Sequence, residues 1–155
     1  MSAYYNEHDP KAAAWLRELI KQGHIADGEV DERSIVDVKP EDLRGFVQCH
    51  FFAGIGVWSY ALRQAGWSDD RPVWTGSCPC QSFSAAGKGA GFDDPRHLWP
   101  HFYRLISECH PPVVFGEQSS RDEVEAPNLR QFRAARGDRM HRDSLPPASI
   151  PPVPI

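Results

Sequence analysis

Trp74-Thr75-Gly76-Ser77-Cys78-Pro79-Cys80-Gln81-Ser82-Phe83-Ser84 is the stretch around which the chain is organised, because an apolar strand here leads into a cysteine and a glycine-rich loop. Parallel α/β sheets bind their ligands at the carboxyl ends of the strands, so we expect the Cys80 thiol to lie at a functional site. A thiol in such a place can act as a nucleophile. Cys78 and Cys80 could equally be small packing residues or metal ligands, and this stretch alone leaves both interpretations open.

Composition limits the class of protein. A chain of 155 residues, 41% of them hydrophobic, fits one globular domain with a real core. The net charge of -4 argues against a surface that grips polyanions everywhere, so any contact with nucleic acid must be local. The chain has no apolar run of membrane-spanning length and no export signal, and its four cysteines do not suggest a disulfide framework. We therefore expect a cytoplasmic protein with reduced thiols.

The amino-terminal part reads as strand, acidic cluster and helix. Residues 3–6 are aromatic and strand-like, and they run into Glu7-His8-Asp9; Pro10 then opens a helix that Gly23 ends. A carboxylate at the end of such a strand commonly binds a ribose hydroxyl, although Asp9 could simply cap the helix. A second short strand is expected within residues 28–38.

A glycine turn follows the next strand. Residues 46–52 are strongly apolar and lead to Ala53-Gly54-Ile55-Gly56, after which a helix runs from Val57 until Gly66 ends it. Glycines between a buried strand and a helix let the backbone pass close to a ligand, and the helix offers its free N–H groups there. A lone Gly-x-Gly is weak evidence, because it lacks the third glycine of the dinucleotide fingerprint.

Several blocks together resemble one enzyme family, the DNA cytosine-5 methyltransferases, particularly those of phages and prophages. The blocks that match in order are Phe52–Gly56, Pro79–Ser84, Gly91–Arg96 with Leu98, and Val113–Glu117. Asn6–Asp9 and Gly28–Val30 resemble the family's ribose-binding and adenine-binding blocks, which ordinarily follow the glycine turn. Here they precede it, so the resemblance implies a permuted order. It covers residues 3 to 118 and then stops.

The resemblance implies a fold and a domain plan. The fold is α/β, a Rossmann-like S-adenosylmethionine-dependent methyltransferase sheet with flanking helices, incomplete on its carboxyl-terminal side. Residues 1–118 would form the partial catalytic domain. Residues 119–155 are rich in arginine and proline without apolar periodicity, so we expect a disordered tail.

The family's chemistry assigns roles to individual residues. Carbon 5 of cytosine is a poor nucleophile, so the family's cysteine, here Cys80, adds to carbon 6. Glu117 matches the glutamate that assists at ring nitrogen 3, and apolar surroundings that keep its carboxyl group protonated would suit this role. The resemblance implies that the methyl donor is S-adenosylmethionine. The resemblance assigns its binding to Phe52, Ala53, Gly54, Ile55, Gly56, Glu7, His8, Glu29, Val30, Pro79 and Leu98.

Double-stranded DNA is the implied substrate, and the target base must be turned out of the duplex. The resemblance assigns DNA contacts to Gln81, Ser84, Lys88 and Arg96. Lys88 could instead be solvated, and Arg96 could form a surface ion pair with Asp93 or Asp94. The family's target-recognition domain has no counterpart in the sequence, so a complementing polypeptide is a possible partner.

Two other classes stay open. The pairs Cys49-His50, Cys78-x-Cys80 and Cys109-His110 could supply zinc ligands, but their spacings do not match the usual knuckle, so we expect no metal. A truncated remnant that binds S-adenosylmethionine or a partner without turnover is the second alternative.

Overall fold

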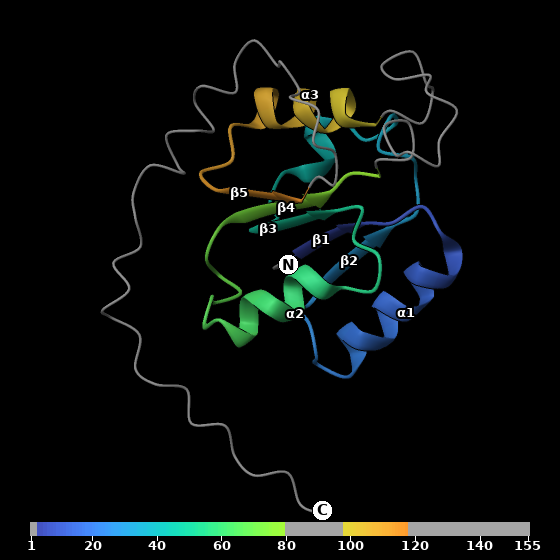
Figure 1. Ribbon diagram of the computed structural model, residues 1–155, viewed down its shortest axis with the longest axis vertical. Helices are drawn as coiled ribbons and strands as arrows, with labels where there is room; N and C mark the ends of the chain where they lie inside the picture. The colour runs from blue at the N-terminus through green and yellow to red at the C-terminus, as the bar shows by residue number, and fades with distance from the viewer. Residues whose placement is uncertain (1–2, 80–97, 118–155) are drawn as a thin grey trace, which may run out of the picture. The chain divides into compact units, whose positions relative to one another are not determined.

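A computed structural model describes residues 3–79 and 98–117. Within them the chain forms five strands, three α-helices and one 3₁₀ helix (Figure 1), and the predicted α/β class is confirmed. In chain order the elements are β1 (Ala3–Asn6), α1 (Pro10–Lys21), β2 (Gly28–Asp31), the 3₁₀ helix η1 (Pro40–Leu43), β3 (Gln48–Phe51), α2 (Val57–Gln64), β4 (Val73–Ser77), α3 (Trp99–Cys109) and β5 (Val114–Glu117).

The strands form one parallel sheet in the order β2-β1-β3-β4-β5. Tyr5 of β1 is in register with Val30 of β2 on one side and with His50 of β3 on the other. All residues of β1 and β3 are buried, as expected for central strands of a parallel sheet covered on both faces. The sheet therefore brings the ends of β1 and β3 side by side.

Helices cover the two faces of the sheet, and α3 lies on the opposite side from α1 and α2 (Figure 1). Tyr5 packs against Leu16 of α1, and its hydroxyl group lies 3.0 Å from Ser59 Oγ of α2, so both helices cover the face that Tyr5 occupies. On the other face the ring of Phe102 in α3 packs against Phe51, with 5.0 Å between centroids. Gly76 makes this approach possible, since an added Cβ would lie 2.7 Å from Phe102 Cζ.

Local sequence signals predict α1 and are also present in α3, which was not predicted. Asp9 caps α1 by accepting hydrogen bonds of 2.9 Å from the N–H groups of Lys11 and Ala12. Helix α3 was not predicted, although its buried residues recur at helical spacing: Phe102, Leu105 and Ile106. The predicted strand toward Cys80 is shorter than expected, because β4 ends at Ser77. Cys80 and the predicted tail over 119–155 lie outside the described residues.

The crossovers through α1 and α2 have opposite hands. The β1–α1–β2 connection steps toward one edge of the sheet and β3–α2–β4 steps toward the other, although α1 and α2 cover the same face. The crossovers on the other face, through η1 and α3, step toward β5 and therefore share the hand of β1–α1–β2. Because about 98% of parallel crossovers are right-handed, β3–α2–β4 is the left-handed exception.

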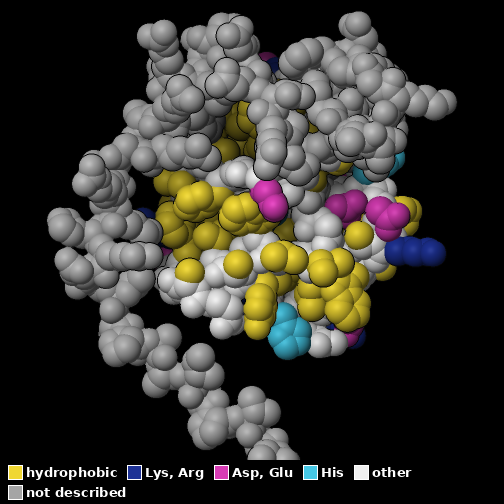
Figure 2. Space-filling model, in the orientation of Figure 1, with side chains coloured by type: hydrophobic (Ala, Val, Ile, Leu, Met, Phe, Trp, Pro, Cys, Tyr) yellow, Lys and Arg dark blue, Asp and Glu magenta, His cyan; other side chains and the backbone are white. Residues whose placement is uncertain are grey.

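Hydrophobic side chains are exposed on the outer side of α1 and α2 (Figure 2). They line a shallow groove of about 250 Å³ between the two helices, where Trp15 is 53% exposed and Ile55 is 62% exposed. None of the helices among the described residues combines the length and the apolar character that crossing a membrane would require.

Candidate functional site

The candidate site lies where the chain changes direction in the sheet. The connection after β1 leaves toward β2, whereas the connection after its neighbour β3 leaves toward β4. Open α/β sheets bind ligands in the crevice that such a switch creates outside the carboxyl ends of the strands. Glu7 follows β1 at this point, and the turn 52–56 follows β3.

The turn after β3 has an unusual backbone. Phe52, Gly54 and Gly56 all have positive φ angles, of 52°, 56° and 81°. Glycine adopts such angles without cost, but Phe52 is strained there, and strain of this kind collects at functional sites. The Phe52 ring meets Phe102 of α3 edge to face, with 6.1 Å between centroids. Gly56 starts α2 and leaves room for Leu16, whose Cδ2 would lie 3.2 Å from an added Cβ.

Glu7 ties the turn to the end of β1. Its Oε2 accepts a 2.7 Å hydrogen bond from the N–H group of Gly54, and its Oε1 accepts a 2.8 Å bond from the N–H group of Asp9. One carboxylate therefore links the two loops that border the crevice. Each oxygen has a second lone pair, so the same carboxylate can still accept hydrogen bonds from a ligand hydroxyl group.

The neighbours of Glu7 have structural partners. Nδ1 of His8 lies 2.9 Å from the carbonyl oxygen of Glu32, which ties the β1 loop to the residue after β2. Asp9 caps α1. Of the three residues in the acidic cluster, Glu7 is thus the one whose side chain contacts the glycine turn.

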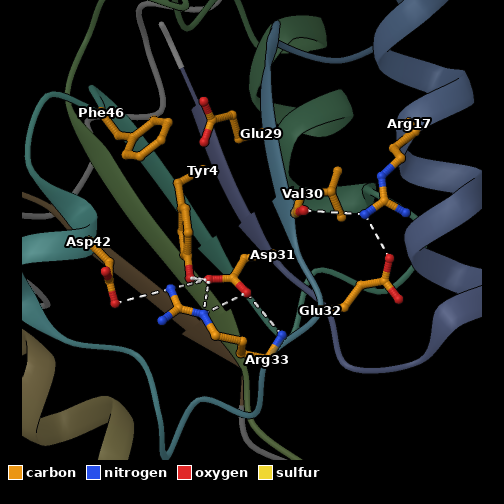
Figure 3. Close-up of a pocket in the computed structure, with 9 residues that line it drawn as sticks. All are labelled: Tyr4, Arg17, Glu29, Val30, Asp31, Glu32, Arg33, Asp42 and Phe46. Carbon is orange, nitrogen blue, oxygen red and sulfur yellow. Dashed lines mark hydrogen bonds and ion pairs between the residues drawn. The ribbon is translucent and has the colours of Figure 1, made fainter.

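Glu29 and Val30 are not brought to the glycine turn. Val30 packs against the core beneath α1. Glu29 is exposed, and both residues line a pocket of about 390 Å³ that also includes Tyr4 and Phe46 (Figure 3). Asp31, which the sequence analysis did not single out, stands at the carboxyl end of β2 level with Asn6.

The Asp31 carboxylate is held by its neighbours rather than presented to the crevice. It accepts a 2.7 Å hydrogen bond from the Tyr4 hydroxyl group and several from Arg33, which also pairs with Asp42 at 3.0 Å (Figure 3). Burial opposes ionisation of Asp31, but the hydrogen bonds from Arg33 outweigh it and lower the pKa of this carboxyl group. Burial, followed by the bond to Asp31, raises the pKa of Tyr4.

The ends of β4 and β5 meet beside the crevice. Ser77, the last residue of β4, is in register with Glu117, the last residue of β5. Glu117 is exposed, so the described residues do not supply the apolar surroundings that its predicted role favours. Pro79 is exposed two residues beyond Ser77. Leu98 is the N-cap residue before α3, and its carbonyl oxygen accepts a hydrogen bond from the N–H group of Phe102. The other predicted residues of this region lie outside the described part: Cys80, Gln81, Ser84, Lys88 and Arg96.

The structure describes three of the four cysteines that were considered as metal ligands, Cys49, Cys78 and Cys109. Within residues 3–79 and 98–117, no group of three or more His, Cys, Asp or Glu side chains could hold a metal ion. Cys49 and Cys78 are buried, and burial raises the pKa of the Cys49 thiol. Cys109 is half-buried, and its thiol pKa is also raised by burial.

Sequence comparison addresses the part of the chain that contains β4, α3 and β5. Residues 68–121 match the family model of the C-5 cytosine-specific DNA methylases. This match supports the resemblance drawn from the sequence blocks and includes both Cys80 and Glu117. It covers less than half of the chain, and the Glu7 loop and the glycine turn precede it. No curated protein and no solved structure matches the chain.

Sequence reasoning missed one side chain that links these parts. Trp58 in α2 donates a 2.8 Å hydrogen bond from Nε1 to Ser77 Oγ and stacks on Phe115 of β5. The alternation of β4 and β5 could have placed Ser77 and Phe115 on one face. The direction of the Trp58 indole depends on how α2 crosses the sheet, which the sequence pattern does not reveal.

Proposed function

We propose that this chain is a DNA cytosine-5 methyltransferase that uses S-adenosylmethionine and a covalent Cys80 adduct, and that a complementing polypeptide supplies target recognition. The family match over residues 68–121 carries the proposal. The position of the Glu7 loop and the glycine turn at the switch point of the sheet supports it independently, because those residues lie outside the matched segment.

The residues at the switch point fit such a cofactor. Glu7 retains acceptor capacity for the ribose hydroxyl groups. Among the described residues, the nearest atom to a Cβ added at Gly54 is the carbonyl oxygen of Phe52, at 4.0 Å. Glu7 follows β1 and Glu117 ends β5, so both side chains belong to the edge of the sheet that the carboxyl ends of the strands form. Glu7, Phe52 and Gly54 are the residues that would hold the cofactor, which supplies an electrophilic methyl group when bound.

The chain's own residues would prepare the base. The Cys80 thiolate adds to carbon 6 of the extruded cytosine, while Glu117 donates a hydrogen bond to ring nitrogen 3, and carbon 5 thereby becomes nucleophilic. Once carbon 5 carries the methyl group, water takes the remaining proton from carbon 5 and the Cys80 thiolate leaves carbon 6, which restores the aromatic ring and the free thiolate. Both residues fall within the family match, and neither role rests on a metal ion.

Covalent trapping tests this assignment. Random-sequence duplex DNA in which cytosine is replaced by 5-fluorocytosine is incubated with the full chain, S-adenosylmethionine and a cell extract that supplies the complementing polypeptide. Fluorine at carbon 5 blocks release of the enzyme, so a covalent adduct accumulates. We expect a denaturant-stable adduct with the natural chain and with Cys109→Ala, and none with Cys80→Ala. Gel electrophoresis followed by peptide mass spectrometry measures the adduct. An adduct with Cys80→Ala would show that another group is the nucleophile.

A binding protein without turnover is the second candidate, because the glycine turn and its Glu7 contact are formed by residues that precede the matched segment. Calorimetry with S-adenosylmethionine separates the two. Binding that is lost in Gly54→Trp, together with no adduct from the natural chain even when cell extract supplies a complementing polypeptide, favours the binding protein.

We also infer that the order of the chain is rearranged relative to the family. A right-handed path from α2 would lead to β1 rather than to β4, which gives the order β3-α2-β1-α1-β2-η1-β4. In that order the glycine turn precedes the Glu7 loop. The family match begins at residue 68, just after α2 ends at Gln64, which is where the present order departs from the right-handed one.

A reordered chain tests this inference. Residues 46–71, 3–45 and 72–155 are joined in that order through short glycine-serine linkers, so that every residue of the described sheet is kept and every crossover is right-handed. We expect a folded protein with an unchanged circular dichroism spectrum and a dissociation constant for S-adenosylmethionine within about threefold of the natural chain, since the contacts of the turn are retained. A reordered chain that remains unfolded where the natural chain folds would contradict the inferred order.

A further inference from the structure

One side chain connects the glycine turn to both strands on the far side of the crevice. Trp58 lies in the first turn of α2, two residues after Gly56. Its Nε1 donates a 2.8 Å hydrogen bond to Ser77 Oγ, and its ring stacks on Phe115 with 6.1 Å between centroids and 9° between planes. The indole is half-buried, so these contacts are partly shielded from water.

The two partners of Trp58 lie next to Glu117. Ser77 is in register with Glu117 across the β4–β5 pair, and Phe115 precedes Glu117 by two residues on the same strand. Residues two apart on a strand share a face, so Ser77, Phe115 and Glu117 lie on the face that Trp58 covers. Through Trp58, the first turn of α2 therefore contacts the end of β4 at Ser77 and β5 at Phe115.

The other tryptophan against Phe115 provides a comparison within the same cluster. Trp67 meets the Phe115 ring edge to face, with 5.9 Å between centroids. Its Nε1 donates to the carbonyl oxygen of Arg71, in the loop before β4, rather than to a strand end. Trp67 thus contacts the same Phe115 ring as Trp58 but in a different geometry, and its indole N–H bonds Arg71 rather than Ser77.

We propose that Trp58 is a positioning residue that couples occupancy of the glycine turn to the placement of the β4 and β5 ends. This inference rests on the proposed function, since the occupant is S-adenosylmethionine. An indole held by both a directional hydrogen bond and a stacked ring has little freedom to move independently of its partners. Trp58 is joined to the glycine turn by the two residues of chain that follow Gly56, and it contacts Ser77 and Phe115, so the turn and the two strands are physically connected.

Hydrogen exchange on the full chain, with and without S-adenosylmethionine, tests the coupling. In the natural chain we expect the cofactor to slow amide exchange about tenfold in residues 52–57 and also in residues 113–117. In Trp58→Phe and in Ser77→Ala the protection of 52–57 should persist, while that of 113–117 falls to less than about twofold. A purely structural role would raise exchange equally with and without ligand, so the ligand-dependent difference is the diagnostic quantity.

Matched variants make the outcomes distinct. Trp67→Phe, the same substitution against the same Phe115 ring, should retain both protections. The double variant Trp58→Phe/Ser77→Ala should lose no more protection of residues 113–117 than either single variant, because both substitutions remove the same hydrogen bond. If Trp58→Phe does not fold, Ser77→Ala decides alone, since it removes only a hydroxyl group. Protection of 113–117 that survives in Ser77→Ala overturns the coupling. If S-adenosylmethionine does not slow exchange in residues 52–57 of the natural chain, the proposed cofactor site is wrong, and the proposed coupling is wrong with it.

Discussion

Gly28→Ala is expected to unfold most of the protein under conditions in which the natural chain is folded. Gly28 opens β2, and a Cβ added there would overlap the carbonyl oxygen of Ala3 on β1 and lie 2.6 Å from its carbonyl carbon. These are backbone atoms of a fully buried strand, so they cannot rotate away as a side chain could. We expect a loss of about 3 kcal/mol or more, a large part of the stability of a typical domain.

Urea denaturation followed by circular dichroism measures this loss, and Gly116→Ala is its control. Gly116 also lies in a strand, but an added Cβ would stand 3.5 Å from the carbonyl oxygen of Gly76, an ordinary contact. The control should shift the urea midpoint only slightly. Equal midpoints for the two variants would contradict the close approach of β1 and β2.

Acidification should destabilise the protein through His50. This histidine is 1% exposed on β3, stacked on Tyr5. Gln48 donates its amide group to the carbonyl oxygen of Ser68, which leaves its own oxygen as an acceptor for His50 Nε2–H, while Nδ1 accepts from the Thr75 hydroxyl group at 2.8 Å. Burial lowers the pKa of His50 to about 4, and the nearby Asp69 only partly opposes this.

The direction of the effect follows from the lowered pKa. Between about pH 6.5 and 4 the unfolded chain binds a proton at this position and the folded chain does not. The contribution of His50 to stability is therefore complete above pH 6.5 and falls by about 3 kcal/mol as the pH drops to 4. Urea titrations across this range measure it. His50→Gln should flatten the slope of stability against pH, and an unchanged slope in this variant would refute the assignment.

Much of the fold follows from local patterns. Pro10 and Gly23 bracket α1, and the apolar run before Gly54 marks β3, because capping and burial act over a few residues. Helix α3 carries an equally clear pattern, because its buried residues Phe102, Leu105 and Ile106 recur at helical spacing. The sequence therefore contained enough information to predict this helix. The hand of the β3–α2–β4 crossover has no local signal, because it depends on which face α2 covers.

The candidate site was harder to predict residue by residue. Glu7 and the glycine turn could be named from their places after two strands, and they do meet. Glu29 could not be assigned in this way, since a shift of one residue along a strand moves a side chain to the opposite face. The role of Trp58 could not be predicted from local sequence, because it depends on contacts with Ser77 and Phe115, which lie 19 and 57 residues further along the chain.

The contacts of Glu7 bear on how a ligand would be received. Both carboxylate oxygens accept hydrogen bonds from main-chain N–H groups in the absence of a ligand, one in the loop after β1 and one in the turn after β3. The backbone that a ligand would contact is therefore preorganised, and ligand binding costs little conformational entropy in these two loops. Affinity at this crevice is then set by the contacts that the ligand itself makes, rather than reduced by the ordering of a loose loop.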